Sequence, residues 1–182
     1  MPAKFATLLA ACAAICSLAC IGAGPATAAG LVAPPGTCPE AAAGAAAEEA
    51  TMLCLTNYAR AQAGEPALEP AVALQDSAGE KAADILRCDS FSHFACGREF
   101  SYWIRANGYM STECWHVGEN LAWGTGRYGS VSSIFRAWLR STEHRENLLD
   151  ARFTQVGIDL RVGSLEGERG ARIWAQAFGS HC

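Results

Sequence analysis

Two segments near the C-terminal end of the chain alternate so cleanly that they limit the fold to a few architectures. The first covers residues 154–162 and the second covers residues 173–178. The first places Thr154, Val156, Ile158, Leu160 and Val162 on one face. The second carries sizeable or close-packing side chains on both faces, with Trp174 opposite Ile173. Because both faces of that strand need cover, we expect a sheet enclosed between two layers of helices.

A third strand is expected over residues 115–124, and it carries a charge in an apolar row. The two-residue period of a strand places Glu119 on the same face as Val117, Leu121 and Trp123. Burying that carboxylate without a partner would cost several kcal/mol. Glu119 therefore either meets hydrogen-bond donors, histidines or a cation in a pocket, or bonds a neighbouring loop from an edge strand.

Helical spacing of apolar residues predicts four helices. Their expected ranges are 48–63, 70–87, 98–106 and 131–140. In the second helix, Glu80, Lys81 and Asp84 are expected on the outside. Ser130 is the expected N-cap of the last helix, and Ser141 falls on the flank of its buried face, where it could look into a cleft. Residues 142–149 are read as a short polar helix or turn.

These elements predict an α+β protein. We expect an α-β-α sandwich in which a three-stranded, mainly antiparallel sheet lies between helical layers and is stapled by disulfides.

The first 28 residues have the layout of a secretory signal peptide. Lys4 precedes an apolar run, and small residues at Ala26 and Ala28 suit a cleavage site. A lipid anchor at Cys12 or Cys20 is the disfavoured alternative, because the first lies too close to the start and the second has a serine where a bulky aliphatic residue is expected. Residues 29–47 are then an Ala/Pro/Gly-rich lead-in, and residues 48–182 form the domain. We expect an extracellular or periplasmic protein.

Cysteine usage supports export. Six cysteines follow residue 28, an even number that is typical of a disulfide framework in a secreted chain. Several connectivities remain open. The expected one pairs Cys88 with Cys96 and Cys114 with Cys182, which leaves Cys38 with Cys54. None of the spacings is the C-x-x-C of a zinc or redox site.

Charge and hydropathy indicate neither a nucleic-acid or anionic-membrane partner nor a membrane anchor. After residue 28 the chain has 13 basic and 18 acidic residues, a net charge of −5, which does not indicate a nucleic-acid or anionic-membrane partner. No second long apolar run follows the signal, so no transmembrane anchor is expected. The sequence gives no indication of oligomeric state.

A set of short motifs in a fixed order resembles a known family. The motifs are Asn57-Tyr58-Ala59-Arg60, Phe91-Ser92-His93, Gly108-Tyr109, Gly118-Glu119-Asn120-Leu121, Trp138-x-x-Ser141, His144-Arg145-x-Asn147-Leu148, Phe153-x-x-Val156-Gly157 and Trp174-x-Gln176-x-Phe178-Gly179. Together they resemble the bacterial branch of the CAP superfamily, named for cysteine-rich secretory proteins, antigen 5 and pathogenesis-related 1 proteins. The resemblance runs from about residue 48 to residue 179 and implies the same α-β-α sandwich.

The resemblance also implies a cleft lined by two histidines and two acidic residues, which in some members holds a divalent cation. The matching residues here are His93, His144 and Glu119. Ser141 stands where animal and plant members have the second acid, and Glu143 is the nearest substitute. A set of two histidines and one glutamate would suit zinc, and the missing fourth ligand should weaken binding.

Other polar residues near these motifs are expected to be structural. His116 lies on the opposite strand face from Glu119, and His181 is close to the end of the chain, so we place both outside the cleft. Arg145 and Asn147 suit tying a turn to backbone carbonyls.

Three functions are compatible with these features. The resemblance implies a secreted module that binds a small apolar ligand, such as a sterol or lipid, or an extracellular protein. The alternative is a hydrolase with Glu119 as base and Ser141 as nucleophile beside His144, or with a cation on His93 and His144 that activates water. Neither G-x-S-x-G nor H-E-x-x-H is present. The third function is an envelope or extracellular protein that acts through its surface.

Overall fold

The structure is a computed structural model that describes residues 30–39, 44–111 and 113–182. The expected signal peptide over residues 1–28 lies outside the described residues. Among the described helices, none is long and apolar enough to cross a membrane.

The core of the fold is a sheet with strand order β1-β3-β4-β2. Strands β2 (Trp115–Thr125), β3 (Gln155–Leu165) and β4 (Glu168–His181) are antiparallel, as expected. A fourth strand, β1 (Glu69–Pro70), pairs in parallel with the start of β3, so the expected strand count of three was wrong. Two residues that include a proline show no alternation, which explains why the pattern missed β1.

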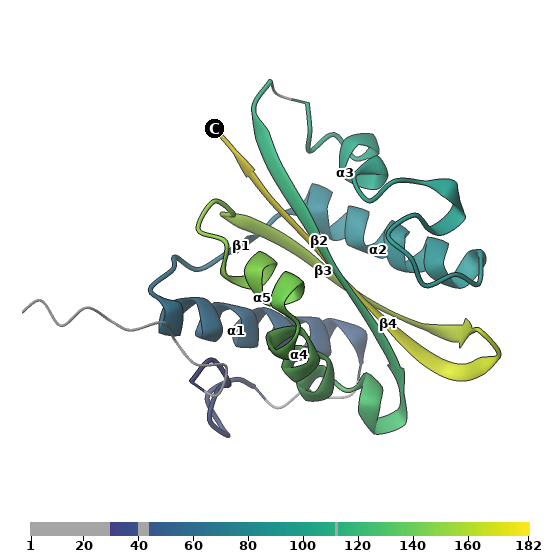
Figure 1. Cartoon of the computed structure of the whole chain (residues 1–182), viewed down its shortest axis with the longest axis horizontal. Helices are drawn as coiled ribbons and strands as arrows, with labels where there is room; N and C mark the ends of the chain where they lie inside the picture. Colours follow the sequence, from purple (N-terminus) through teal and green to yellow (C-terminus); the bar gives the residue numbers. More distant parts are fainter. Residues whose placement is uncertain (1–29, 40–43, 112) are drawn as a thin grey trace, which may run out of the picture.

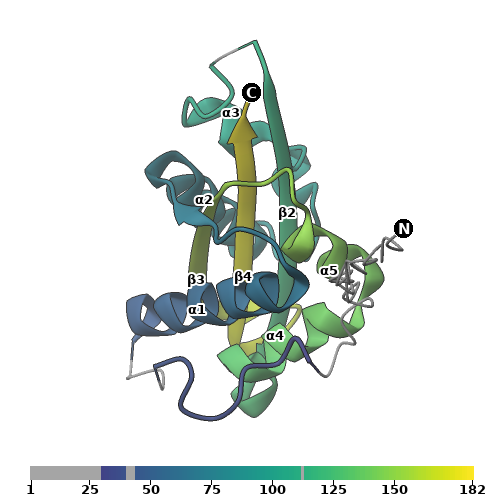
Figure 2. The same cartoon turned by 90° about the vertical axis from the view of Figure 1, so that its left-hand side faces the viewer.

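Helices cover both faces of the sheet, which confirms the expected sandwich (Figures 1 and 2). Helices α1 (Ala45–Ala63), α4 (Val131–Arg140) and α5 (Thr142–Leu149) lie on one side. Helices α2 (Val72–Arg87) and α3 (Tyr102–Ala106) lie on the other. Single 3-10 turns at Ala95–Gly97 and Gly126–Gly129 complete the described elements.

Each side of the sheet has its own apolar cluster. Trp138, Phe153 and Phe178 belong to the cluster under α1 and α4, while Leu74, Ile85 and Ile173 belong to the cluster under α2. This division follows from the alternation of β3 and β4 and explains why the final strand needs apolar residues on both faces.

The expected disulfide connectivity is confirmed for all three pairs: Cys38–Cys54, Cys88–Cys96 and Cys114–Cys182. The second closes a short loop between α2 and α3, and the third joins the residue before β2 to the residue after β4.

A buried arginine ties the end of α1 to the start of β3. Arg60 is 0% exposed, and its guanidinium donates to the carbonyls of Pro66, Leu148, Asp150 and Phe153 at 2.7–3.1 Å. These carbonyls belong to the segment after α1, to the last turn of α5 and to the turn between α5 and β3. One side chain therefore sets the position of α5 relative to α1 and the sheet.

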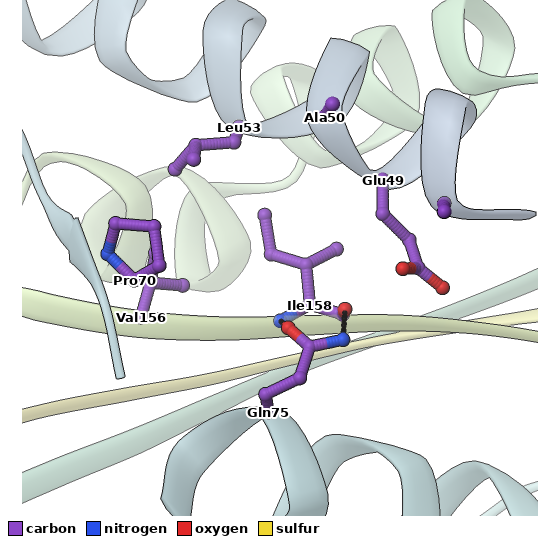
Figure 3. Close-up of a pocket in the computed structure, with 8 residues that line it drawn as sticks. Glu49, Ala50, Leu53, Pro70, Gln75, Val156 and Ile158 are labelled. Carbon is purple, nitrogen blue, oxygen red and sulfur yellow. Dashed lines mark hydrogen bonds between the residues drawn. The ribbon is translucent and has the colours of Figure 1, made fainter. Parts of the chain in front are cut away.

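Side chains also continue the pairing of β3 beyond β1. The Gln75 amide bonds both the N–H and the carbonyl of Ile158 (Figure 3). The Glu49 carboxylate accepts from the Leu160 N–H at 3.0 Å. Between them lies a small hollow of about 200 Å³ beside Leu53 and Val156. The polar groups of this hollow satisfy the open edge of the sheet, which is a common way to protect an edge strand.

We predict that Arg60→Lys lowers the free energy of unfolding by about 3 kcal/mol or more, because an ammonium cannot replace the planar five-donor fork and leaves buried carbonyls without donors. Urea denaturation of the oxidised protein would measure the loss. The exposed Arg140→Lys is the matched control and should change stability by less than about 0.5 kcal/mol. An Arg60→Lys variant as stable as this control would contradict the assigned role.

Candidate functional site

The site lies along the free edge of β2. One edge of β2 pairs with β4, while carbonyls on the other edge accept from side chains of α4 and α5. Asn147 Nδ2 donates to the Glu119 carbonyl and Trp138 Nε1 donates to the Leu121 carbonyl, both at 3.2 Å. These bonds hold the junction of α4 and α5 against the middle of the strand.

Glu119 is buried and paired with His93. Glu119 is 8% exposed, and its Oε1 atom lies 2.6 Å from Nδ1 of His93. Burial raises the pKa of Glu119 above its usual value, while the His93 bond and the charge of Lys81 oppose that shift. Of the two alternatives for Glu119, the structure supports a carboxylate that meets a histidine in a pocket.

The loop that carries His93 is held from two directions. The Cys88–Cys96 disulfide closes it, and Lys81 Nζ donates to the His93 carbonyl at 2.7 Å. The expectation that Lys81 and Asp84 point outward was wrong, since they are 1% and 0% exposed. The reason is that the loop folds back over this side of α2, which helical spacing alone does not reveal.

Both carboxylate oxygens of Asp84 accept hydrogen bonds from side chains other than Lys81. Its carboxylate accepts from Arg87 at 2.5 Å, from Arg98 at 2.8 Å and from Trp103 Nε1 at 2.7 Å. Asp84 therefore anchors the segment that follows the loop to α2.

His144 contacts Ser141 and not Glu119. His144 Nδ1 lies 2.8 Å from Ser141 Oγ, and the same hydroxyl accepts from the His144 N–H as the N-cap of α5. Burial lowers the pKa of His144, and nearby His93 lowers it further, against smaller opposing effects of Glu143 and the Leu121 backbone. The neutral imidazole is therefore favoured near neutral pH.

Two open hollows lie side by side along β2 and the loop before the Ala95–Gly97 turn, and together we call them the β2 cleft. The polar hollow has a volume of about 260 Å³ and is lined by His93, Phe100, Gly118, Glu119 and Asn147. The apolar hollow has a volume of about 320 Å³ and is lined by Phe91, Leu121, Ala122, Trp123, Ala137, Trp138, Ser141 and His144. The sequence-predicted residues thus occupy one cleft but divide between its two parts.

The fit of a metal ion to this arrangement is poor. Within residues 30–39, 44–111 and 113–182, no group of three or more His, Cys, Asp or Glu side chains could hold a metal ion. His93 and Glu119 line one hollow and His144 lines the other, while Glu143 is exposed and lines neither. The three-residue zinc set stays a prediction that this geometry does not support, and no chemical step is derived through a metal.

The four residues that we expected to be structural form stacking or hydrogen-bond contacts within the fold. His116 stacks on Phe153 and lies 3.3 Å from Asp150, and His181 bonds the Tyr109 carbonyl at 2.8 Å. Arg145 donates to the Leu139 carbonyl at 2.9 Å. Asn147 ties α5 to β2 as expected, but it also lines the polar hollow, a role that the sequence did not indicate.

Comparison with known proteins identifies clear similarities. The model of the cysteine-rich secretory protein family (CAP) matches residues 53–178. The uncharacterized protein YkwD of Bacillus subtilis (strain 168) is 29% identical over 132 residues, which are 72% of this chain and 47% of that protein.

Solved structures share the fold. An extracellular protein containing an SCP domain from Bacillus anthracis str. Ames has a TM-score of 0.59 at 21% identity, over 74% of this chain and 40% of that one. An outer surface protein from Borrelia burgdorferi has a TM-score of 0.59 at 20% identity, over 72% of this chain and 90% of that one. The chain thus spans less than half of the Bacillus proteins that it matches.

We predict that Glu119→Gln becomes more stable relative to the wild type as the pH rises from about 4.5 to 7. A carboxyl group with a raised folded-state pKa contributes stability below its unfolded pKa of about 4.5, and this contribution is lost as the pH rises through the folded value. Glutamine cannot lose a proton and escapes that loss. Urea denaturation at several pH values would measure the difference.

The exposed Glu146→Gln is the control and should show a much smaller pH dependence of the difference from wild type. If the wild type instead gains stability over Glu119→Gln with rising pH, the pKa of Glu119 is lowered, and the assigned effect of burial is wrong.

Proposed function

Because this chain belongs to the CAP (cysteine-rich secretory protein) family, we propose that it is a secreted binding module whose β2 cleft takes a small, mainly apolar ligand of the sterol or lipid class. The observation that carries this proposal is the apolar hollow. An extracellular protein that inserts an apolar side chain into the same cleft is the alternative occupant.

The walls and ends of the apolar hollow suit such a ligand. Phe91 and Trp123 are half-buried, and their ring centroids are 6.5 Å apart, so both can cover part of a ligand. Trp138 and Leu121 form the buried floor. His144 and Ser141 supply the few polar atoms that could orient a hydroxyl or carboxyl head group. Apolar walls with a small number of placed polar groups are typical of small-molecule sites.

Several observations support function outside the cytoplasm. Three disulfides in a domain of this size are characteristic of oxidising compartments. Two of the matched structures are described as extracellular and outer surface proteins. The predicted signal peptide over residues 1–28 agrees with them.

A hydrolase is the second candidate, and one contact favours it. The Ser141 hydroxyl lies within hydrogen-bond distance of His144, whose lowered pKa leaves a neutral imidazole able to accept a proton. The same contact has a simpler explanation, because Ser141 caps α5 and His144 follows three residues later. We therefore rank binding above hydrolysis.

We predict that Trp123→Ala weakens binding of a fluorescent sterol or of palmitate at least about tenfold, because a buried aromatic contact contributes about 1.5–3 kcal/mol. Fluorescence titration of the sterol and calorimetry of palmitate would measure the affinities. Trp115→Ala is the control, since Trp115 is an exposed tryptophan of the same strand that lines neither hollow. If both variants bind like the wild type, or neither probe binds, the proposed ligand class is wrong and the surface of the protein becomes the better candidate.

We also predict that the wild type hydrolyses p-nitrophenyl butyrate no faster than Ser141→Asn does. Asparagine keeps the N-cap but removes the nucleophilic hydroxyl, whereas Ser141→Ala also costs about 1 kcal/mol of stability. A wild-type rate more than about a hundredfold above that of Ser141→Asn would favour the hydrolase instead.

A further inference from the structure

We propose that the ammonium group of Lys81 is a built-in cation of the β2 cleft: it supplies the charge for Glu119 and the contact to the His93 loop, so that the cleft is assembled without a metal ion. The proposal goes beyond the proposed function, because it does not depend on which ligand the cleft binds.

The position of Lys81 is unusual for a lysine. Lys4 and Lys81 are the only lysines in the sequence, and Lys81 is 1% exposed. Lysine is almost never fully buried unless its charge is paired, because removing an ammonium ion from water is costly. A specific partner inside the protein must therefore offset the cost of burying Lys81.

The charges around Lys81 identify that partner. Burial lowers the pKa of Lys81, while the carboxylates of Glu119 and then Asp84 oppose that shift and Arg98 adds to it. Asp84 already has two arginines and an indole N–H on its carboxylate. Glu119 has one side-chain partner among the described residues, His93. The positive charge of Lys81 in turn favours the ionised form of Glu119, and Lys81 is connected to Glu119 through His93.

The hydrogen bond of Lys81 adds a positioning role. Its Nζ donates to the carbonyl of His93 at 2.7 Å, and the side chain of the same residue meets Glu119 at 2.6 Å. Lys81 on α2, His93 on the loop and Glu119 on β2 therefore form one connected set. A metal ion on His93 and Glu119 would connect the loop to the strand in the same way.

The remaining polar groups of the cleft leave a divalent cation little to bind. The polar hollow is lined by one carboxylate, that of Glu119, and one imidazole, that of His93, while Ser141 and His144 line the neighbouring hollow. A divalent ion would meet one carboxylate that an ammonium already compensates, and like charges at short range repel strongly in a partly buried site.

The test is a calorimetric titration of Zn²⁺ into the oxidised, untagged protein at neutral pH. We expect weak or no binding by the wild type and at least about tenfold tighter binding by Lys81→Gln, which removes the charge and keeps an N–H donor for His93. The gain should disappear in the double variant Lys81→Gln/Glu119→Gln. Arg105→Gln removes an exposed charge from α3 and should leave zinc affinity unchanged within about twofold.

A second variant separates the charge from the hydrogen bond. Lys81→Met removes both, so it should gain zinc affinity as Lys81→Gln does and also show faster amide hydrogen exchange in residues 89–95. If exchange in that loop is the same in the methionine and wild-type proteins, the positioning role is wrong.

If the Lys81 variants fail to fold, two measurements on the wild-type protein test the proposal instead. A saturable 1:1 zinc site that His93→Ala removes would overturn the proposal, as would a neutral amine at Lys81 in the ¹⁵Nζ spectrum of lysine-labelled protein. An ammonium signal that is protected from solvent exchange, together with no saturable zinc site, would support it.

Discussion

Burial of a carboxylate in the middle of an edge strand is the constraint on which the cleft depends. Glu119 cannot remain ionised in an apolar row without partners, and the chain supplies them from two directions, with His93 on a disulfide-closed loop and Lys81 beneath it. Each partner is itself placed by the fold, because α2 carries Lys81 and the Cys88–Cys96 bond closes the loop. The chemistry of the polar hollow thus follows from one buried charge.

The edges of the sheet are closed by side chains, and this determines what the cleft can accept. Trp138 and Asn147 donate to carbonyls on the free edge of β2, while Gln75 and Glu49 bond the edge of β3. A protected edge is a poor template for an added strand. The ligand that we propose for the β2 cleft would therefore contact side-chain walls, aromatic in one hollow and polar in the other, which suit a compact apolar molecule or a single inserted side chain.

Much of this architecture could be predicted from the sequence, because alternation and helical spacing report burial directly. The sandwich followed in this way. The disulfide pairs were expected from the positions of the cysteines along the chain, and alternation placed Glu119 in an apolar row without deciding which partner it meets. Lys81 and Asp84 could not be placed, since helical spacing identifies the face toward the sheet and not the face that a returning loop covers. The sequence also could not predict that His93 and His144 line different hollows, because the order of motifs along a chain does not give the distance between side chains.

The central claim is that Lys81, Glu119 and His93 assemble the cleft without a metal ion. The most direct measurement is a crystal structure at neutral pH from crystals grown in excess zinc, with anomalous data collected at the zinc edge. The account predicts Lys81 Nζ bonded to the His93 carbonyl beside Glu119, with no anomalous peak at these side chains. A zinc ion coordinated by His93, Glu119 and His144, with Lys81 displaced, would contradict it.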